Sequence, residues 1–195
     1  MPNELHNITQ IAYHASMKLY LARHGRTNYN DLDLCNADPT VDVHLTETGQ
    51  AQAQSLDKQL SQKNIDQIYV SQLKRTQQTA AFINTAHHAP IKIDPRLNDI
   101  RTGYESKPSR EYYTALDQAE NKWTARFNDG ESIEDTNERV RACINELRAL
   151  PHQSILIITS EAIVQTIHGI LKNLSNQEAQ AFHVEQGGYI ELDLN

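Results

Sequence analysis

Polar and charged residues lie where three apolar stretches of the sequence end. Arg23 and His24 follow the first stretch, Arg75 lies just after the second, and Ser160 and Glu161 follow the third. If these stretches are strands of an open α/β sheet, the residues meet beyond the carboxyl ends of the strands, where such sheets bind ligands. Two guanidinium groups donate paired hydrogen bonds to phosphate oxygens, so the combination predicts a site for a phosphoryl group.

His24 is the residue of this set that is suited to act as a nucleophile. Arg23 and Arg75 carry permanent positive charge, and nearby like charge lowers the pKa of a histidine. We therefore expect a neutral imidazole with a nitrogen able to attack phosphorus. Gly25 is expected to let the backbone approach the ligand closely, and a helix beginning at Ser71 would add free N–H groups for phosphate.

Short apolar runs alternate with helical periodicity from Met17 onward, and these elements must position the site. Such alternation is typical of βα units around a mostly parallel sheet, so the predicted fold class is α/β. The most apolar run, 154–159, is expected to be the central strand, and the irregular stretch 95–108 is expected to be an active-site loop. Strands are predicted at 18–22, 67–70, 91–93, 154–159 and 188–192, and helices after a Thr46 cap, from a Ser71 cap to 83, and at 109–127, 132–149 and 161–172.

Length and charge exclude several classes of protein. The 195 residues include 18 Lys plus Arg and 25 Asp plus Glu, a formal net charge of −7, which argues against a nucleic-acid or membrane-surface partner. We expect one domain over 17–195, preceded by an N-terminal extension over 1–16. The polar N-terminus does not resemble a signal peptide, and the longest apolar run, 155–158, is far shorter than the roughly 20 residues of a membrane span, so a cytoplasmic location is expected.

A metal centre is the competing class of chemistry. The sequence has 9 histidines, but none has the HxxxH or HExxH spacing that places two ligands on one metal. The two cysteines, Cys35 and Cys143, are too far apart in sequence for a CxxC site. We therefore expect no metal and no other cofactor.

Four segments resemble motifs of the histidine phosphatase superfamily, the phosphoglycerate-mutase-like proteins. LARHGRTNYN at 21–30 resembles its RHGxTxxN signature, and LTETGQAQA at 45–53 resembles LTxxGxxQA. SQLKRTQQTA at 71–80 resembles SxLxRAxQTA, and 130–132 matches a GES element. The resemblance covers about 17–192 and implies a three-layer α/β/α sandwich around the mostly parallel sheet.

The resemblance also implies roles for individual residues. His24 would be phosphorylated during turnover, Arg23 and Arg75 would clamp the phosphoryl oxygens, and Thr27 and Asn30 would line the same pocket.

The general acid of the family is usually a glutamate in an LxExxxGxxEG loop. Here 97–106 read LNDIRTGYES, which places Asp99 at that position. Glu105 is the second candidate for the acid, and an ordinary solvated loop charge is an equally good interpretation of it.

Glu161 marks a departure from the family. A second catalytic histidine normally follows the central strand in a pattern like VSHGGV, whereas 158–164 read ITSEAIV. Losing one preorganised donor typically costs about 10² to 10³ in rate, and a carboxylate about 4 Å from a phosphoryl charge adds roughly 4 kcal/mol of repulsion at an effective dielectric near 20.

Three interpretations of Glu161 remain open, beside that of a simple helix first-turn acid. It is protonated or turned away and leaves a slow phosphatase, it pairs with Arg23 or Arg75 and partly fills the phosphate site, or it serves another ligand or reaction. Ser160, at the same strand end, is a candidate for substrate binding.

The sequence therefore predicts a phosphomonoester hydrolase that acts through a phosphohistidine at His24 and is weakened or altered by Glu161. The alternative is a catalytically impaired relative, a pseudophosphatase that binds a ligand or a protein. A phosphoglycerate mutase is less favoured, because 104–128 are compact where mutases carry an insertion. Tyr112, Tyr113, Trp123 and Phe127 in this segment are expected to cover the pocket or to pack as ordinary helix residues, with a small phosphorylated metabolite or a phosphoprotein as substrate. The oligomeric state is left open.

Overall fold

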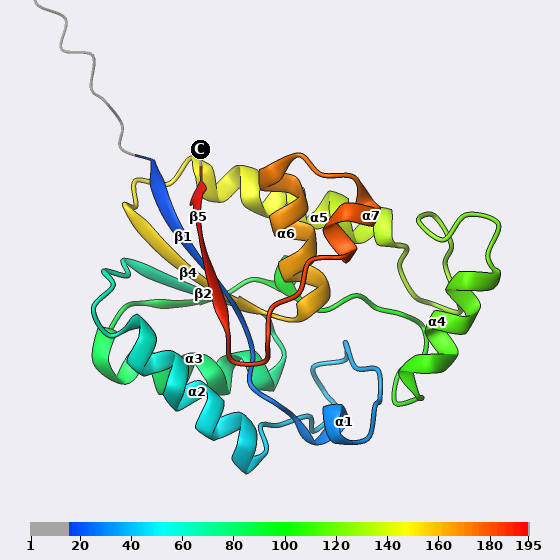
Figure 1. Ribbon diagram of the computed structural model, residues 1–195, viewed down its shortest axis with the longest axis horizontal. Helices are drawn as coiled ribbons and strands as arrows, with labels where there is room; N and C mark the ends of the chain where they lie inside the picture. Colours follow the sequence, from blue (N-terminus) through cyan, green and yellow to red (C-terminus); the bar gives the residue numbers. More distant parts are fainter. Residues whose placement is uncertain (1–15, 195) are drawn as a thin grey trace, which may run out of the picture.

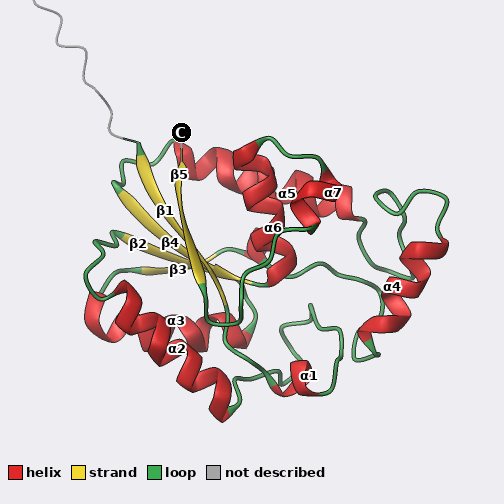
Figure 2. Ribbon diagram, viewed as in Figure 1, coloured by secondary structure: helices red, strands yellow, loops and turns green. Residues whose placement is uncertain are grey.

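The computed structural model describes residues 16–194, and a five-stranded sheet forms its centre (Figures 1 and 2). The order of the strands is β3-β2-β4-β1-β5, with β5 antiparallel to β1 and the other pairs parallel. The predicted α/β class with a mostly parallel sheet is confirmed, and so is the central place of β4. The strands are β1 (Met17–Arg23), β2 (Gln67–Val70), β3 (Ile91–Ile93), β4 (Ser154–Thr159) and β5 (Tyr189–Leu194).

Helices cover both faces of this sheet. Figure 1 shows α2 and α3 on one face and α5 and α6 on the other, with α1 and α4 beyond the sheet. This is the expected three-layer arrangement. The helices are α1 (Asn28–Asp31), α2 (Glu47–Leu60), α3 (Lys74–His87), α4 (Ser109–Gln118), α5 (Ile133–Arg148), α6 (Glu161–Lys172) and α7 (Asn176–Gln180).

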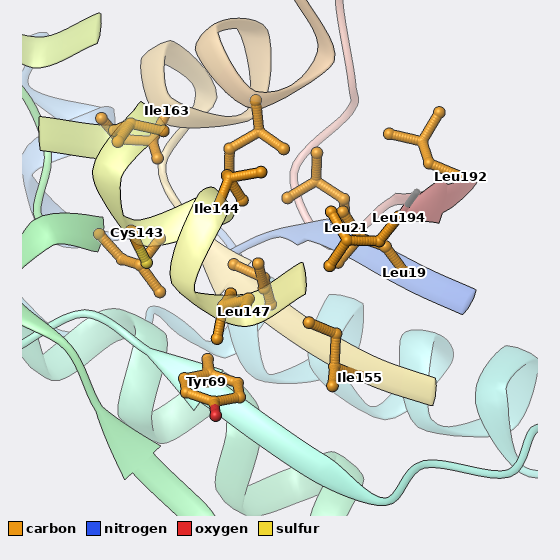
Figure 3. Packing of buried hydrophobic residues seen from close by; sticks show 14 of the residues in the cluster. Leu19, Leu21, Tyr69, Cys143, Ile144, Leu147, Ile155, Ile163, Leu192 and Leu194 are labelled. Atoms are coloured by element: carbon orange, nitrogen blue, oxygen red, sulfur yellow. The ribbon is translucent and has the colours of Figure 1, made fainter. Parts of the chain in front are cut away.

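Alternation along β1 divides the core between these two layers. Leu19 and Leu21 belong to the cluster that α5 and α6 complete, which Figure 3 shows with Ile144 and Leu147 of α5. Tyr20 and Ala22 belong to the opposite cluster, which contains residues of α2 and α3. β4 is buried along its whole length, as expected of a strand covered on both faces.

The register of the parallel strands brings their carboxyl ends together. Arg23, the last residue of β1, pairs with Thr159 of β4, and Val70 of β2 pairs with Ile158. The residues that follow these strands, among them His24 and Ser160, therefore leave the sheet at one edge. The main chain binds across this edge, because His24 N donates to the carbonyl oxygen of Thr159 at 3.0 Å.

The prediction that Ser71 caps the next helix is wrong. Helix α3 begins at Lys74, with Leu73 as its N-cap, and continues to His87 rather than 83. The Ser71 hydroxyl instead lies 2.8 Å from the Thr76 hydroxyl and accepts from the backbone N–H of Leu73. Ser71 thus stabilises the turn that leads into α3.

The predicted helix over 109–127 is also too long, because α4 ends at Gln118. Phe127 folds back so that its ring centroid lies 6.0 Å from that of Tyr112 and 5.9 Å from that of Tyr104. Trp123 lies in the segment between, where its carbonyl oxygen accepts from Glu134 N at 3.0 Å. The ammonium group of Lys122 lies 4.4 Å from the centroid of the indole ring.

The remaining boundaries are close to the predictions. Thr46 caps α2 as expected, Ser132 caps α5 through a reciprocal capping box, and α6 begins and ends at the predicted residues. The helices α1 and α7 and a 3₁₀ turn at Pro95–Leu97 were not predicted. No helix within 16–194 is long and apolar enough to cross a membrane. The predicted extension, 1–16, lies outside the described residues except for Ser16, so the predicted domain boundary stays a prediction.

Candidate active site

His24 lies at the end of β1 as a buried imidazole with a partner on each ring nitrogen. Nδ1 is 2.7 Å from the carbonyl oxygen of Gly25, and Nε2 accepts from Arg75 Nε at 3.0 Å. Because a carbonyl only accepts and a guanidinium only donates, these partners assign the proton to Nδ1 and the lone pair to Nε2. Burial, and then the charges of Arg75 and Arg23, lower the pKa of His24 well below its ordinary value of 6.5. The direction of this pKa shift agrees with the expectation from the sequence, with burial as the larger cause.

Arg75, in the first turn of α3, is buried among acceptors that fix its guanidinium group. Nη1 donates to Asn36 Oδ1 at 2.7 Å, and Nη2 donates to the Asn36 carbonyl oxygen at 3.0 Å. Nη2 also lies 3.1 Å from Asp99 Oδ2. Arg75 therefore faces His24 and Asp99 in a single orientation.

Glu105 stabilises this arrangement through its contact with Asn36. It accepts from Asn36 Nδ2 at 2.8 Å and from the backbone N–H of Ala37, so it orients the Asn36 amide oxygen toward Arg75. Glu105 lies outside the lining of the active-site cavity, and Asp99 lies within it. Sequence reasoning did not find Asn36, because nothing in a loop asparagine signals a guanidinium partner.

Asp99 is placed by a loop that a buried ion pair anchors. Arg139 of α5 donates to the carbonyl oxygens of Arg96 and Asp99 and forms an ion pair with Glu131 at 2.7 Å. Glu131, the middle residue of the GES element, also accepts from Arg101 N at 3.0 Å. In the GES element, Glu131 therefore fixes the loop that carries Asp99, and Ser132 caps α5.

Thr27 and Asn30 form the capping box of α1 at the edge of the same cavity. Asn30 N donates to the Thr27 hydroxyl, and Asn30 Oδ1 accepts from the Thr27 backbone N–H at 3.0 Å. Both residues line the cavity, as predicted. Gly25 does not line it. A Cβ at Gly25 would lie 2.3 Å from the carbonyl oxygen of Gly49, so this glycine allows close packing against α2 rather than approach to a ligand.

Arg23 is held by a carboxylate of the protein. Its Nη1 lies 2.9 Å from Glu161 Oε2 and donates to the Val184 carbonyl oxygen at 3.0 Å. The second oxygen of Glu161 contacts His183 Nδ1. The interpretation that Glu161 pairs with one of the two arginines is therefore confirmed for Arg23.

Ser160 is the N-cap residue of α6, but its hydroxyl makes no capping bond. Ser160 is 3% exposed, lines the cavity, and its Oγ has no hydrogen-bond partner among residues 16–194. Nε of Arg23 is likewise buried without a partner in this part of the chain. Both atoms thus have hydrogen-bonding capacity that no residue of 16–194 uses.

The cavity that collects these groups has a volume of about 330 Å³. Ser71 lies outside its lining, so the free helix N–H groups predicted there do not form part of it. No group of three or more His, Cys, Asp or Glu side chains within 16–194 is arranged to hold a metal ion. The predicted site residues that line the cavity are Arg23, His24, Thr27, Asn30, Arg75, Asp99, Ser160 and Glu161.

Comparison with known proteins agrees with this geometry. The model of the histidine phosphatase superfamily (branch 1) matches residues 19–195 of the chain. The chain belongs to the histidine phosphatase superfamily. Its mostly parallel sheet with helices on both faces is thus a histidine phosphatase fold.

Relatives in this superfamily cover nearly the whole chain. The adenosylcobalamin/alpha-ribazole phosphatase of Escherichia coli K12 is 30% identical over 190 residues, which cover 92% of this chain and 91% of that protein. The probable phosphoglycerate mutase GpmB of Enterobacter sp. (strain 638) is 31% identical over 168 residues, 79% of this chain and 76% of that protein. The crystal structure of the alpha-ribazole phosphatase from Shigella flexneri has a TM-score of 0.82 at 28% identity and covers 92% of this chain and 91% of its own.

Proposed function

We propose that this histidine phosphatase hydrolyses phosphomonoesters through a phosphohistidine at His24. The observation that carries the proposal is the pair of contacts of the buried His24 ring: Nδ1 faces the Gly25 carbonyl oxygen and Nε2 accepts from Arg75 Nε, which places the lone pair on Nε2. A nucleophile of this kind, held next to a permanent cation, is suited to attack a phosphoryl group.

The proposed reaction has two steps. Nε2 of His24 attacks phosphorus, the bond from phosphorus to the ester oxygen breaks, and the leaving alkoxide takes a proton from the Asp99 carboxyl group. Water then attacks the phosphohistidine, gives a proton to Asp99, and releases phosphate with His24 neutral again. Arg75 Nε, which binds Nε2 in the free protein, transfers its hydrogen bond to a phosphoryl oxygen.

Glu161 opposes the first step. A substrate must compete with this carboxylate for Nη1 of Arg23, and the two negative charges repel by roughly 4 kcal/mol at about 4 Å in a medium of dielectric near 20. Ser160 Oγ and Arg23 Nε remain as donors for the phosphoryl oxygens. We therefore expect slow turnover, because Glu161 holds Arg23 and its charge opposes the phosphoryl group.

Hydrolysis of p-nitrophenyl phosphate between pH 4 and pH 8 tests the proposal. Slow activity that is absent from His24→Ala is the expected result. The variant Glu161→His should raise activity at pH 7, because it replaces the opposing charge with a donor. Hydrolysis that persists in His24→Ala would refute a phosphohistidine mechanism.

A binding protein without turnover is the second candidate, and the contact of Glu161 with both Arg23 and His183 favours it. In that case the wild-type protein binds phosphate esters, which calorimetry detects, but releases no phosphate at any pH. We propose small phosphorylated compounds as ligands in both cases, because the named relatives are phosphatases or mutases of such compounds.

A further inference from the structure

A second cavity, of about 310 Å³, adjoins the active-site cavity. It lies among residues of α4, α5, α6 and α7, on the side of the molecule where Figure 1 shows α4 and α7. The two cavities have a common boundary, so a group bonded to a phosphoryl oxygen in the first can extend into the second. The residues that line both are Ile100, Tyr112, Tyr113, Ala162 and Gln165.

The boundary favours flat groups. Tyr112 is buried and Tyr113 is 61% exposed, and their ring centroids lie 5.6 Å apart. The exposed ring of Tyr113 is available to stack on a ring of a ligand. Ala162, in the first turn of α6, lines both cavities with only a methyl group.

The second cavity combines apolar surface with amides. Leu116, Ile133 and Ile170 contribute the apolar part. Asn137 and Gln165 are fixed by the protein, because Asn137 Nδ2 donates to Asn176 Oδ1 at 3.0 Å and Gln165 Nε2 donates to the Phe182 carbonyl oxygen at 2.9 Å. The amide oxygen of Gln165 is left for a donor on a ligand.

Charged side chains of both signs occur at this cavity. Asp117 and Arg141 are exposed, and Lys122 is partly exposed beside Trp123. Such a mixture gives little selection for a second strong anion. Ligand pockets of about 300 to 1,000 Å³ that mix apolar walls with a few fixed polar groups accommodate ring-sized organic molecules.

We propose that the second cavity is a subsite for the alcohol part of the substrate, and that it takes a ring-bearing alcohol with hydrogen-bonding groups, about the size of a nucleoside. The inference rests on the proposed function, because it assumes that the phosphoryl group occupies the cavity at His24. A two- or three-carbon alcohol stays within the first cavity and gains nothing from the second.

Filling the second cavity tests this proposal. Ile170 lines only the second cavity, so Ile170→Trp should obstruct it without touching the phosphoryl site. Lys172→Trp is the matched control, because Lys172 lies on the same helix, is exposed, and lines neither cavity. Both are made in a His24→Ala background, where bound esters are not consumed.

Calorimetry then compares two ligands, adenosine 5′-monophosphate and glycerol 2-phosphate. Ile170→Trp should weaken the nucleotide by about tenfold or more and leave glycerol 2-phosphate within about twofold, while Lys172→Trp changes neither. Equal weakening of the two ligands by Ile170→Trp, or no weakening of the nucleotide, would overturn the subsite. Retained binding of glycerol 2-phosphate shows that the variant is folded. If it is not, Ile170→Phe, which adds less bulk to the same wall, should weaken the nucleotide alone by about fivefold.

Phosphate release by the protein with His24 intact separates this inference from the proposed function. If the binding pattern holds but no ester is hydrolysed, the subsite stands and the phosphatase proposal fails. If both esters are hydrolysed in a His24-dependent manner and Ile170→Trp does not distinguish them, the phosphatase proposal stands and the subsite fails.

Discussion

Oε2 of Glu161 lies 2.9 Å from Nη1 of Arg23, so a carboxylate of the protein occupies a donor that faces the phosphoryl site. The contact joins the end of β1 to the start of α6, the helix that follows the neighbouring strand β4. The candidate site is built at the ends of these two strands. In the free protein Glu161 is therefore the partner of Arg23, and an anionic ligand must displace it.

Removing this charge should increase activity. Glu161→Gln keeps the shape of the side chain and abolishes the repulsion, so we expect kcat/KM for p-nitrophenyl phosphate at pH 7 to rise by about tenfold or more. Glu185→Gln is the control, because Glu185 contacts the other nitrogen of His183 at 3.2 Å and is 87% exposed. A similar rise in both variants would show that net charge, and not the contact with Arg23, limits turnover.

Asn36 should be needed both for activity and for stability. Asn36→Leu leaves Nη1 of Arg75 buried without its acceptor, which typically costs about 1 to 3 kcal/mol in the free energy of unfolding. We also expect KM for p-nitrophenyl phosphate to rise, because Arg75 loses its orientation. Urea unfolding and steady-state kinetics measure the two effects, with Glu105→Gln as a milder variant that keeps an acceptor for Asn36. An unchanged KM in Asn36→Leu would contradict the positioning role.

His24 should make stability depend on pH. Its pKa is lowered in the folded protein, so the unfolded chain binds the proton more tightly and the free energy of unfolding decreases as pH falls below about 6.5. The stabilisation is complete above that pH, and one proton contributes a slope of up to about 1.4 kcal/mol per pH unit. Urea unfolding between pH 5 and pH 7.5 should show a shallower dependence for His24→Gln. Burial also lowers the pKa of His168, so His168→Gln serves as the comparison. Identical slopes in wild type and His24→Gln would exclude this contribution.

The capping box at the start of α5 should stabilise the folded protein. The Ser132 hydroxyl accepts from Asp135 N at 3.1 Å, and the Asp135 carboxylate accepts from Ser132 N. Ser132→Ala is expected to lower the free energy of unfolding by about 1 kcal/mol in urea titrations. Ser55→Ala, on the exposed surface of α2, should change it by less than about 0.5 kcal/mol. Equal effects would mean that the hydroxyl at Ser132 does not act as a cap.

The sequence predicts most of the sheet because apolar runs and strand ends are local signals. The run 154–159 identified the central strand, and the positions of His24, Arg75 and Glu161 after strands were enough to place them in one cavity. Thr46 and the helix 161–172 were likewise predicted from local cap and periodicity signals.

Contacts between distant segments account for what was missed. A continuous helix over 109–127 would hold Tyr112 and Phe127, fifteen residues apart, at about 22 Å. Their rings instead pack at 6.0 Å, because the aromatic cluster with Tyr104 favours a chain that turns back after Gln118. Asn36 contacts Arg75 of α3, and Arg139 of α5 contacts the Asp99 carbonyl oxygen, only in the folded chain. No spacing in the sequence predicts these contacts.

Trp123 is the only tryptophan of the 195 residues, and its neighbour Lys122 lines the second cavity. When the protein is excited at a wavelength that tyrosine does not absorb, its fluorescence therefore comes from one indole. This indole lies in the segment between α4 and α5, beside the ammonium group of Lys122. Any displacement of Lys122 from the ring changes the electric field at that chromophore. The native chain thus contains a single tryptophan, next to a residue of its second cavity, and no label is required to follow that region in solution.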